Sequence, residues 1–185
     1  MLEQAQPDPD LPLLQAIAGG DVGALDALYT RHGRSILSYL LGQLSDQTLA
    51  EEVLQDVMLA VWHGARDFRG ESRVRTWLLA IARRQALSKL RRRRPEALPL
   101  YEDMADEGVN APLEDPVDDA ALRAALRQLP GDQRETLELI FYHHLSGQEA
   151  AEVMGVSPGT IKSRLHRAKT TLRGLLQQKE IGHDR

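Results

Sequence analysis

The segment from residue 95 to residue 119, PEALPLYEDMADEGVNAPLEDPVDD, divides the sequence into two parts. It contains four prolines and nine acidic residues, and no basic residue. Proline cannot sit inside a helix without breaking it, and the acidic side chains repel one another and favour an extended chain. We therefore expect a flexible acidic linker that joins two small domains, residues 1–94 and residues 120–185.

Both parts show the apolar periodicity of α-helices. Apolar residues recur at intervals of three and four, and no run alternates with a period of two for long enough to predict a sheet. We expect a break near Gly19-Gly20 and a weaker interruption near Gly33. A helix within residues 45–65 has Thr48 and Glu51 at capping-box spacing. The predicted fold class is all-α, as two small helical domains.

The helices on either side of the linker have predictable ends. A helix that starts near Arg73 is expected to end at Arg94, because Pro95 disfavours helical geometry in the residue before it. After the linker, a short helix is expected to stop at Pro130-Gly131, and Asp132 is expected to cap the next helix.

Residues 146–172 have the spacing of a helix-turn-helix. Ser146 and Glu149 form a capping box, Gly155 marks the turn, and Ser157 caps a second helix that has Pro158 in its first turn. In such units the second helix enters the DNA major groove with its N-terminal residues at the base edges.

The outward face of this second helix is basic. We expect it to contact bases and phosphates, since arginine reads guanine and lysine mainly adds phosphate affinity. The predicted contact residues are Ser157, Pro158, Thr160, Lys162, Ser163, Arg164, Arg167 and Lys169. Two other interpretations stay open, namely a solvated basic face on a packed helix and a helical hairpin that docks on a protein.

A second basic surface is predicted near the end of the first part. The run from Lys89 to Arg94 follows Arg83 and Arg84 on the same predicted helix, with Trp77 upstream. Basic residues beside aromatic ones can hold unpaired bases and their backbone. Trp77 has an alternative interpretation as a core residue, and Phe68 lies in a predicted loop where it is less constrained.

Charge distribution supports a polyanionic partner. The net charge is −4, but residues 31–94 carry 13 basic and 6 acidic side chains, and residues 120–185 carry 10 basic and 7 acidic ones. Two basic blocks of this kind indicate contact with a polyanion at two places.

Several other classes of protein are disfavoured. The chain has no cysteine, which suits a reducing cytoplasm. The first thirty residues lack the basic start of a signal peptide, and the longest apolar run, VMLAVW, is too short to span a membrane. His143 and His144 are adjacent and point to different sides of a helix, so we expect no metal site. No catalytic motif is present, and no enzyme activity or cofactor is predicted.

The motifs together resemble a known family. The strings AEEVLQDVMLAVW, TWLLAIARRQALSKLRR and LRQLPGDQRETLELIFYHHLSGQEAAEVMGVSPGTIKSRLHRAKTTLR are similar to those of bacterial sigma factors of the extracytoplasmic-function (ECF) class, in the sigma-70 family. The resemblance implies a promoter-recognition subunit, with the first domain as sigma region two and the second as region four. Implied partners are core RNA polymerase, promoter DNA and an anti-sigma protein.

The resemblance also implies roles for residues. Glu52, Gln55 and Asp56 would dock on the clamp helices of the polymerase largest subunit, and the face from Thr160 to Arg167 would read the minus-thirty-five element. The segment that binds and opens the minus-ten element would use Phe68, Thr76, Trp77, Arg83, Arg84, Lys89 and Arg91.

The sequence departs from the family pattern at two positions. Arg84 stands where asparagine is common, and Ser88 stands where an acidic residue is common. Both changes make the minus-ten surface more basic. Two rival functions remain, a helix-turn-helix regulator that acts without polymerase and a helical adaptor that binds no DNA.

Overall fold

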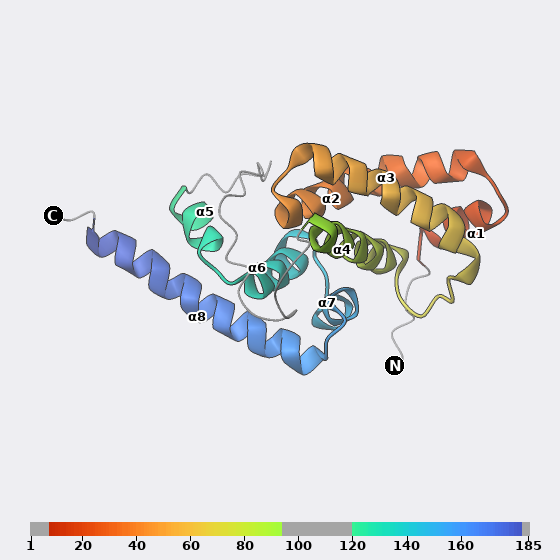
Figure 1. Ribbon diagram of the computed structural model, residues 1–185. Helices are drawn as coiled ribbons and strands as arrows, with labels where there is room; N and C mark the ends of the chain where they lie inside the picture. Colours follow the sequence, from red (N-terminus) through yellow and green to blue (C-terminus); the bar gives the residue numbers. More distant parts are fainter. Residues whose placement is uncertain (1–7, 94–119, 183–185) are drawn as a thin grey trace, which may run out of the picture.

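The computed structural model describes residues 8–93 and 120–182, and every regular element in these ranges is a helix (Figure 1). The all-α prediction is confirmed, whereas the predicted linker, residues 95–119, lies outside the described residues. The elements are α1 (Leu11–Ala18), α2 (Val22–Leu44), α3 (Gln47–Gly64), a short 3₁₀ turn η1 (Ala65–Asp67), α4 (Val74–Arg93), α5 (Ala120–Arg127), α6 (Gly131–Leu137), a π-helical turn η2 (Glu138–Tyr142), α7 (Gly147–Met154) and α8 (Pro158–Gly182).

The first break falls where the sequence places it. Gly20 adopts φ = 93° between α1 and α2, a conformation that favours glycine. Asp21 then caps α2 by accepting a hydrogen bond from the Ala24 amide at 3.2 Å. Helix α2 continues through Gly33 without the expected interruption. This glycine is buried against the Tyr29 ring, where a Cβ would lie only 3.1 Å from ring atoms, so a larger residue would crowd the ring.

Two predicted caps are wrong. Helix α3 starts one residue before Thr48, because Asp46 accepts a hydrogen bond from the Leu49 amide at 3.0 Å and caps the helix first. That backbone hydrogen bond lowers the pKa of the Asp46 carboxyl. Helix α6 follows Pro130 with no side-chain cap, and Asp132 lies inside its first turn.

The helix-turn-helix is confirmed. Ser146 accepts from the Glu149 amide and the Glu149 carboxylate accepts from the Ser146 amide, which completes the capping box. Gly155 has φ = 65° at the turn, and Ser157 accepts from the Thr160 amide at 3.1 Å at the start of α8. The small residues Ala150 and Ala151, together with Ile161, are buried where the two helices meet.

The two halves of the chain share one hydrophobic core. Helix α7 packs directly on α4, and α6 lies beside the same region in Figure 1. Leu139 and Ile161 from the second half belong to the same buried cluster as Leu28 and Leu78 from the first half. The sequence predicted two helical domains but not that they pack on one another, because the composition of a linker carries no information about whether the surfaces it joins are complementary.

We predict that Leu139→Ala will destabilise the whole molecule in one cooperative transition. The side chain is fully buried in the shared core, and a Leu→Ala change at such a site lowers the free energy of unfolding by about 2–5 kcal/mol. Denaturant unfolding followed by circular dichroism and by tryptophan fluorescence measures this, since both tryptophans lie in the first half.

The matched control is Phe141→Ala on the same turn, where the side chain is 55% exposed and the loss should be much smaller. A fluorescence transition that stays at the wild-type position while the circular dichroism transition moves would contradict a shared core.

Candidate nucleic-acid interface

The N-terminal half of α8 presents a polar face that the rest of the described chain leaves open. Ser157 fixes where the helix starts, so this face has a defined position relative to α7. Six of the eight residues predicted for this surface are exposed, namely Ser157, Pro158, Lys162, Ser163, Arg167 and Lys169. Most residues that the sequence predicts for this surface are therefore accessible.

Several residues of this surface already have protein partners. The Arg164 guanidinium lies 2.9 Å from the Asp132 carboxylate of α6, with 19% of the arginine side chain exposed. The Thr160 hydroxyl lies 2.9 Å from the Ser157 hydroxyl. The ion pair is near the surface and contributes little to stability, so Arg164 can exchange this carboxylate for a DNA group at small cost.

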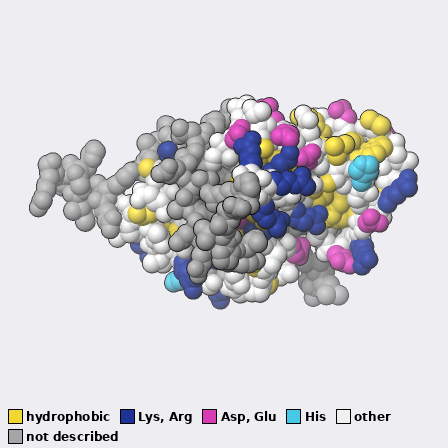
Figure 2. Space-filling model, in the orientation of Figure 1, with side chains coloured by type: hydrophobic (Ala, Val, Ile, Leu, Met, Phe, Trp, Pro, Cys, Tyr) yellow, Lys and Arg dark blue, Asp and Glu magenta, His cyan; other side chains and the backbone are white. Residues whose placement is uncertain are grey.

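The second predicted surface lies on α4 and the loop before it. Lys and Arg side chains gather over the part of the molecule where α4 lies (Figure 2). Arg84 and Arg91 are exposed. The Phe68 and Trp77 rings pack together at 5.2 Å between centroids and are both half-buried against the core. Trp77 therefore packs partly against the core, in agreement with its alternative interpretation as a core residue.

The second half of the chain covers two residues of this surface. Thr76 is buried, and its hydroxyl donates to the Glu149 carboxylate of α7 at 3.2 Å. Arg83 donates to the Glu135 carboxylate of α6 at 2.8 Å. In this arrangement, Glu149 and Glu135 of the second half bind Thr76 and Arg83, two side chains that the sequence predicts to contact DNA.

Glu135 is the centre of the junction between the halves. It is 6% exposed, and it also accepts a hydrogen bond from the Tyr39 hydroxyl of α2 at 2.6 Å. Burial raises the pKa of Tyr39 well above its ordinary value, and the neighbouring Glu135 charge adds to that shift. One buried carboxylate thus joins α2, α4 and α6.

A second acid at the junction is also shielded from water. Glu138 accepts a hydrogen bond from the Gln43 amide at 3.3 Å and lies 3.8 Å from Nε2 of the buried His143. Burial raises the pKa of the Glu138 carboxyl, although His143 opposes the shift. Burial would also raise the pKa of Glu149, but hydrogen bonds from Ser146 and Thr76 outweigh it and lower this pKa.

The predicted polymerase-docking residues lie on the outer face of α3. Glu52 and Gln55 are exposed, and Asp56 is partly so. Lys89 of α4 lies 2.5 Å from Glu52 and 3.6 Å from Asp56, and its hydrogen bond with Glu52 raises the Lys89 pKa. The structure thus brings Lys89, predicted to contact DNA, against residues predicted to contact polymerase.

Sequence reasoning missed the junction residues and an apolar groove. The groove beside Gln55 lies between α2 and α3 and is lined by Val22, Leu25, Tyr29, Leu37, Leu54, Met58, Leu59 and Trp62. Exposed apolar positions on two helices give no sequence signal that they face each other. For Glu135, the available signal was an acid among apolar residues in the second of the two basic blocks.

Residues 8–93 and 120–182 were compared with the requirements of two other kinds of site. These ranges contain no group of three or more His, Cys, Asp or Glu side chains that could hold a metal ion. They also contain no helix with the length and apolar character required to cross a bilayer.

Comparison with known proteins matches both halves of the chain. A family model described as Sigma-70 region 2 matches residues 28–96, and one described as Sigma-70, region 4 matches residues 119–172. The chain is 35% identical over 172 residues to the ECF RNA polymerase sigma factor SigM of Mycobacterium tuberculosis, covering 90% of this chain and 84% of SigM. It is 31% identical over 191 residues to the RNA polymerase sigma-H factor of Pseudomonas aeruginosa, covering 96% and 97%.

Two solved structures are also similar. CnrH, in complex with the cytosolic domain of CnrY, aligns with a TM-score of 0.68 at 25% identity and covers 91% of this chain and 97% of CnrH. The sigma factor RpoE of Bartonella quintana, in complex with the anti-sigma factor NepR, aligns with a TM-score of 0.64 at 25% identity and covers 84% and 98%.

We predict that Glu138→Gln will stabilise the chain increasingly as the pH rises. Because burial raises the pKa of Glu138 above the ordinary 4.5, the folded state binds its proton more tightly than the unfolded state does. The resulting stability is fully present below about pH 4.5 and is lost as the pH rises through the folded-state pKa. The glutamine variant stays neutral and avoids this loss.

His143, Glu135 and Arg134 face Glu138 and also carry titratable or charged groups. The variant and the wild type both keep these residues, so their stabilities are compared at each pH. Denaturant midpoints from pH 4 to pH 7 measure the difference, and Glu152→Gln at an exposed position is the control. A gain that is constant with pH would contradict the proton-linked origin.

Proposed function

This chain belongs to the extracytoplasmic-function group of the bacterial sigma-70 family, and we propose that residues 1–94 act as its minus-ten and polymerase-docking domain and residues 120–185 as its minus-thirty-five domain. As a sigma factor, it is a promoter-recognition subunit of RNA polymerase. The polymerase supplies the chemistry, and we assign no catalytic residue or cofactor to this chain. Its place of action is the cytoplasm, where polymerase and promoter are found.

The capped, exposed N-terminal face of α8 is the observation that supports this assignment most strongly. Lys162, Ser163 and Arg167 are accessible together, and Arg164 is held only by a surface ion pair with Asp132. A helix of this kind fits the major groove, and its arginines suit guanine edges. We assign minus-thirty-five reading to this face.

The minus-ten surface requires the two halves to separate. Arg83 and Thr76 are engaged by Glu135 and Glu149 of the second half, and phosphate groups compete for the same donors. We propose that the packed arrangement is the resting form, and that binding to polymerase holds the halves apart. The free chain would then bind promoter DNA weakly, because the exposed basic surfaces alone are small.

Polymerase docking is assigned to the outer face of α3. Glu52, Gln55 and Asp56 supply polar contacts, and the neighbouring apolar groove adds area that can be buried. In the docked state, Lys89 would either keep its ion pairs with Glu52 and Asp56 or replace them with contacts to DNA phosphates. Its position links the two surfaces.

We also assign an anti-sigma protein as a partner. The similar structures of CnrH and RpoE were solved with the cytosolic domain of CnrY and with the anti-sigma factor NepR. A compact form with a covered minus-ten surface is a suitable target for such a partner, because binding would oppose separation of the halves.

We predict that promoter opening and transcription will require both the chain and core polymerase. Changing Glu52, Gln55 and Asp56 together to alanine should abolish run-off transcription by loss of docking, while the circular dichroism spectrum stays that of a folded helical protein. Gel shifts and run-off transcription, each with and without core polymerase, measure this, and Glu152→Ala on α7 serves as the control.

The rival interpretation, a helix-turn-helix regulator that acts alone, predicts the opposite result. Tight binding of the free chain to one duplex site, with no opening or transcript on addition of core polymerase, would favour the regulator and reject the sigma-factor roles proposed here.

We predict that Arg164→Ala will weaken binding to the matched minus-thirty-five sequence by roughly 1–3 kcal/mol, as expected for a base-reading arginine. Lys169→Ala should reduce affinity by a similar amount on matched and scrambled sites, because a phosphate contact carries little sequence information. The measurement is holoenzyme affinity on both sites.

The matched control is Asp132→Ala, which removes the carboxylate that holds Arg164 and leaves the arginine in place. Its binding should equal or exceed that of wild type. An equal loss on both sites for Arg164→Ala would argue against direct reading.

A further inference from the structure

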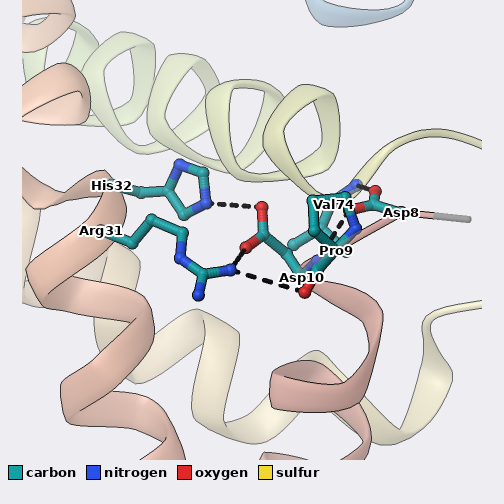
Figure 3. Close-up of polar contacts among 6 residues, drawn as sticks. All are labelled: Asp8, Pro9, Asp10, Arg31, His32 and Val74. Carbon is teal, nitrogen blue, oxygen red and sulfur yellow. Dashed lines mark hydrogen bonds and ion pairs between the residues drawn. The ribbon is translucent and has the colours of Figure 1, made fainter.

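The loop of residues 68–73 is fastened to α1 at both of its ends. Before the loop, Nε of Arg66 donates to the Ala18 carbonyl, at the C-terminal end of α1, at 2.9 Å. After the loop, the Val74 amide donates to Oδ2 of Asp8, just before α1, at 2.6 Å (Figure 3). Helix α1 thus spans the two ends of the loop that leads into α4.

The contact at Asp8 joins the starts of two helices. The first amides of α4 have no partner within the helix, and Asp8 supplies a carboxylate to one of them from 66 positions earlier in the sequence. Its other oxygen accepts from the Asp10 amide at 3.0 Å, at the start of α1. A negative charge at the N-terminus of α4 is also favoured by the helix dipole.

Asp10 holds this segment in place from the other side. It is 5% exposed, and its carboxylate pairs with Arg31 and lies 2.7 Å from Nε2 of His32, both on α2 (Figure 3). The same arginine also reaches the Pro9 carbonyl at 3.5 Å. Because α2 is a core helix, these contacts of Asp10 fix the position of the neighbouring Asp8 relative to the core.

We propose that Asp8 is a positioning residue for promoter opening, which it serves by fixing the start of α4 and hence the loop of residues 68–73. The proposal rests on the minus-ten role assigned above to Phe68 and α4. Thr76 and Trp77 lie in the first turn of α4, directly after the amide that Asp8 holds. A loop held at both ends has less conformational freedom to lose when it binds DNA.

The test compares Asp8→Ala with Asp8→Asn and with Asp21→Ala in the full chain assembled with core polymerase. The asparagine keeps an acceptor oxygen for the Val74 amide. Asp21 is a matched control, because it also caps a helix with its carboxylate, but the helix is α2 and the donor is the Ala24 amide. Strand opening at the minus-ten element is measured by permanganate reactivity, together with binding to the minus-thirty-five element alone.

We expect Asp8→Ala to reduce opening about fivefold, the factor that corresponds to loss of one typical helix cap. Minus-thirty-five binding should be unchanged. Asp8→Asn should retain most of the opening, and Asp21→Ala should open the promoter like wild type even where it lowers thermal stability. Hydrogen exchange at the Val74 amide should accelerate in Asp8→Ala, which ties the effect to this contact.

Normal opening by Asp8→Ala, or an equal loss in Asp21→Ala, would overturn the positioning role. If Asp8→Ala does not fold, the comparison rests on Asp8→Asn. A loss of promoter opening that parallels a loss of hydrogen-exchange protection at the Val74 amide supports the proposal. Promoter opening that does not change with this protection overturns it. Failure of the wild-type chain to open any promoter with core polymerase would instead reject the proposed function itself.

Discussion

The buried ion pair between Arg83 and Glu135 determines how the two halves of the chain fit together. An unpartnered carboxylate at 6% exposure would be strongly unfavourable, so Glu135 requires the guanidinium of α4 and the hydroxyl of Tyr39. Those two donors lie on different helices of the first half, so together they constrain the placement of α6. The apolar core supplies the free energy of packing, and this polar contact specifies its orientation.

Under the function proposed here, the same interaction would make the packed form and the promoter-bound form exclude each other. Carboxylates and phosphates are both anionic acceptors, and Arg83 and Thr76 face the carboxylates here. A partner shifts such an equilibrium only through its different affinity for the two forms. In the proposed scheme, polymerase and DNA would favour separated halves, whereas a partner that bridges both halves would favour the packed form.

Sequence reasoning predicted the features that depend on neighbouring residues. Ser146, Gly155 and Ser157 act within a few positions, so their roles in the helix-turn-helix could be inferred from spacing. The prediction that Thr48 caps α3 was wrong because Asp46, a better acceptor, lies two positions earlier and caps the helix instead. The pairing of Arg83 with Glu135 joins residues 52 positions apart, and no local pattern encodes it. The assignment of these residues to promoter DNA remains a prediction.

Helix α4 is held along its whole length, which suggests an order for DNA binding. Asp8 and Glu149 hold its first turn, Glu135 holds its middle, and Glu52 and Asp46 pair with Lys89 and Arg93 near its end. Arg84 and Arg91 remain exposed along the same helix. Exposed cations meet a polyanion first, because long-range attraction acts before close contact. DNA would therefore be captured at Arg84 and Arg91, and Arg83 would follow once Glu135 withdraws. If this order holds, the exposed Arg84 would strengthen the first step without a cost to the ion pair between Arg83 and Glu135.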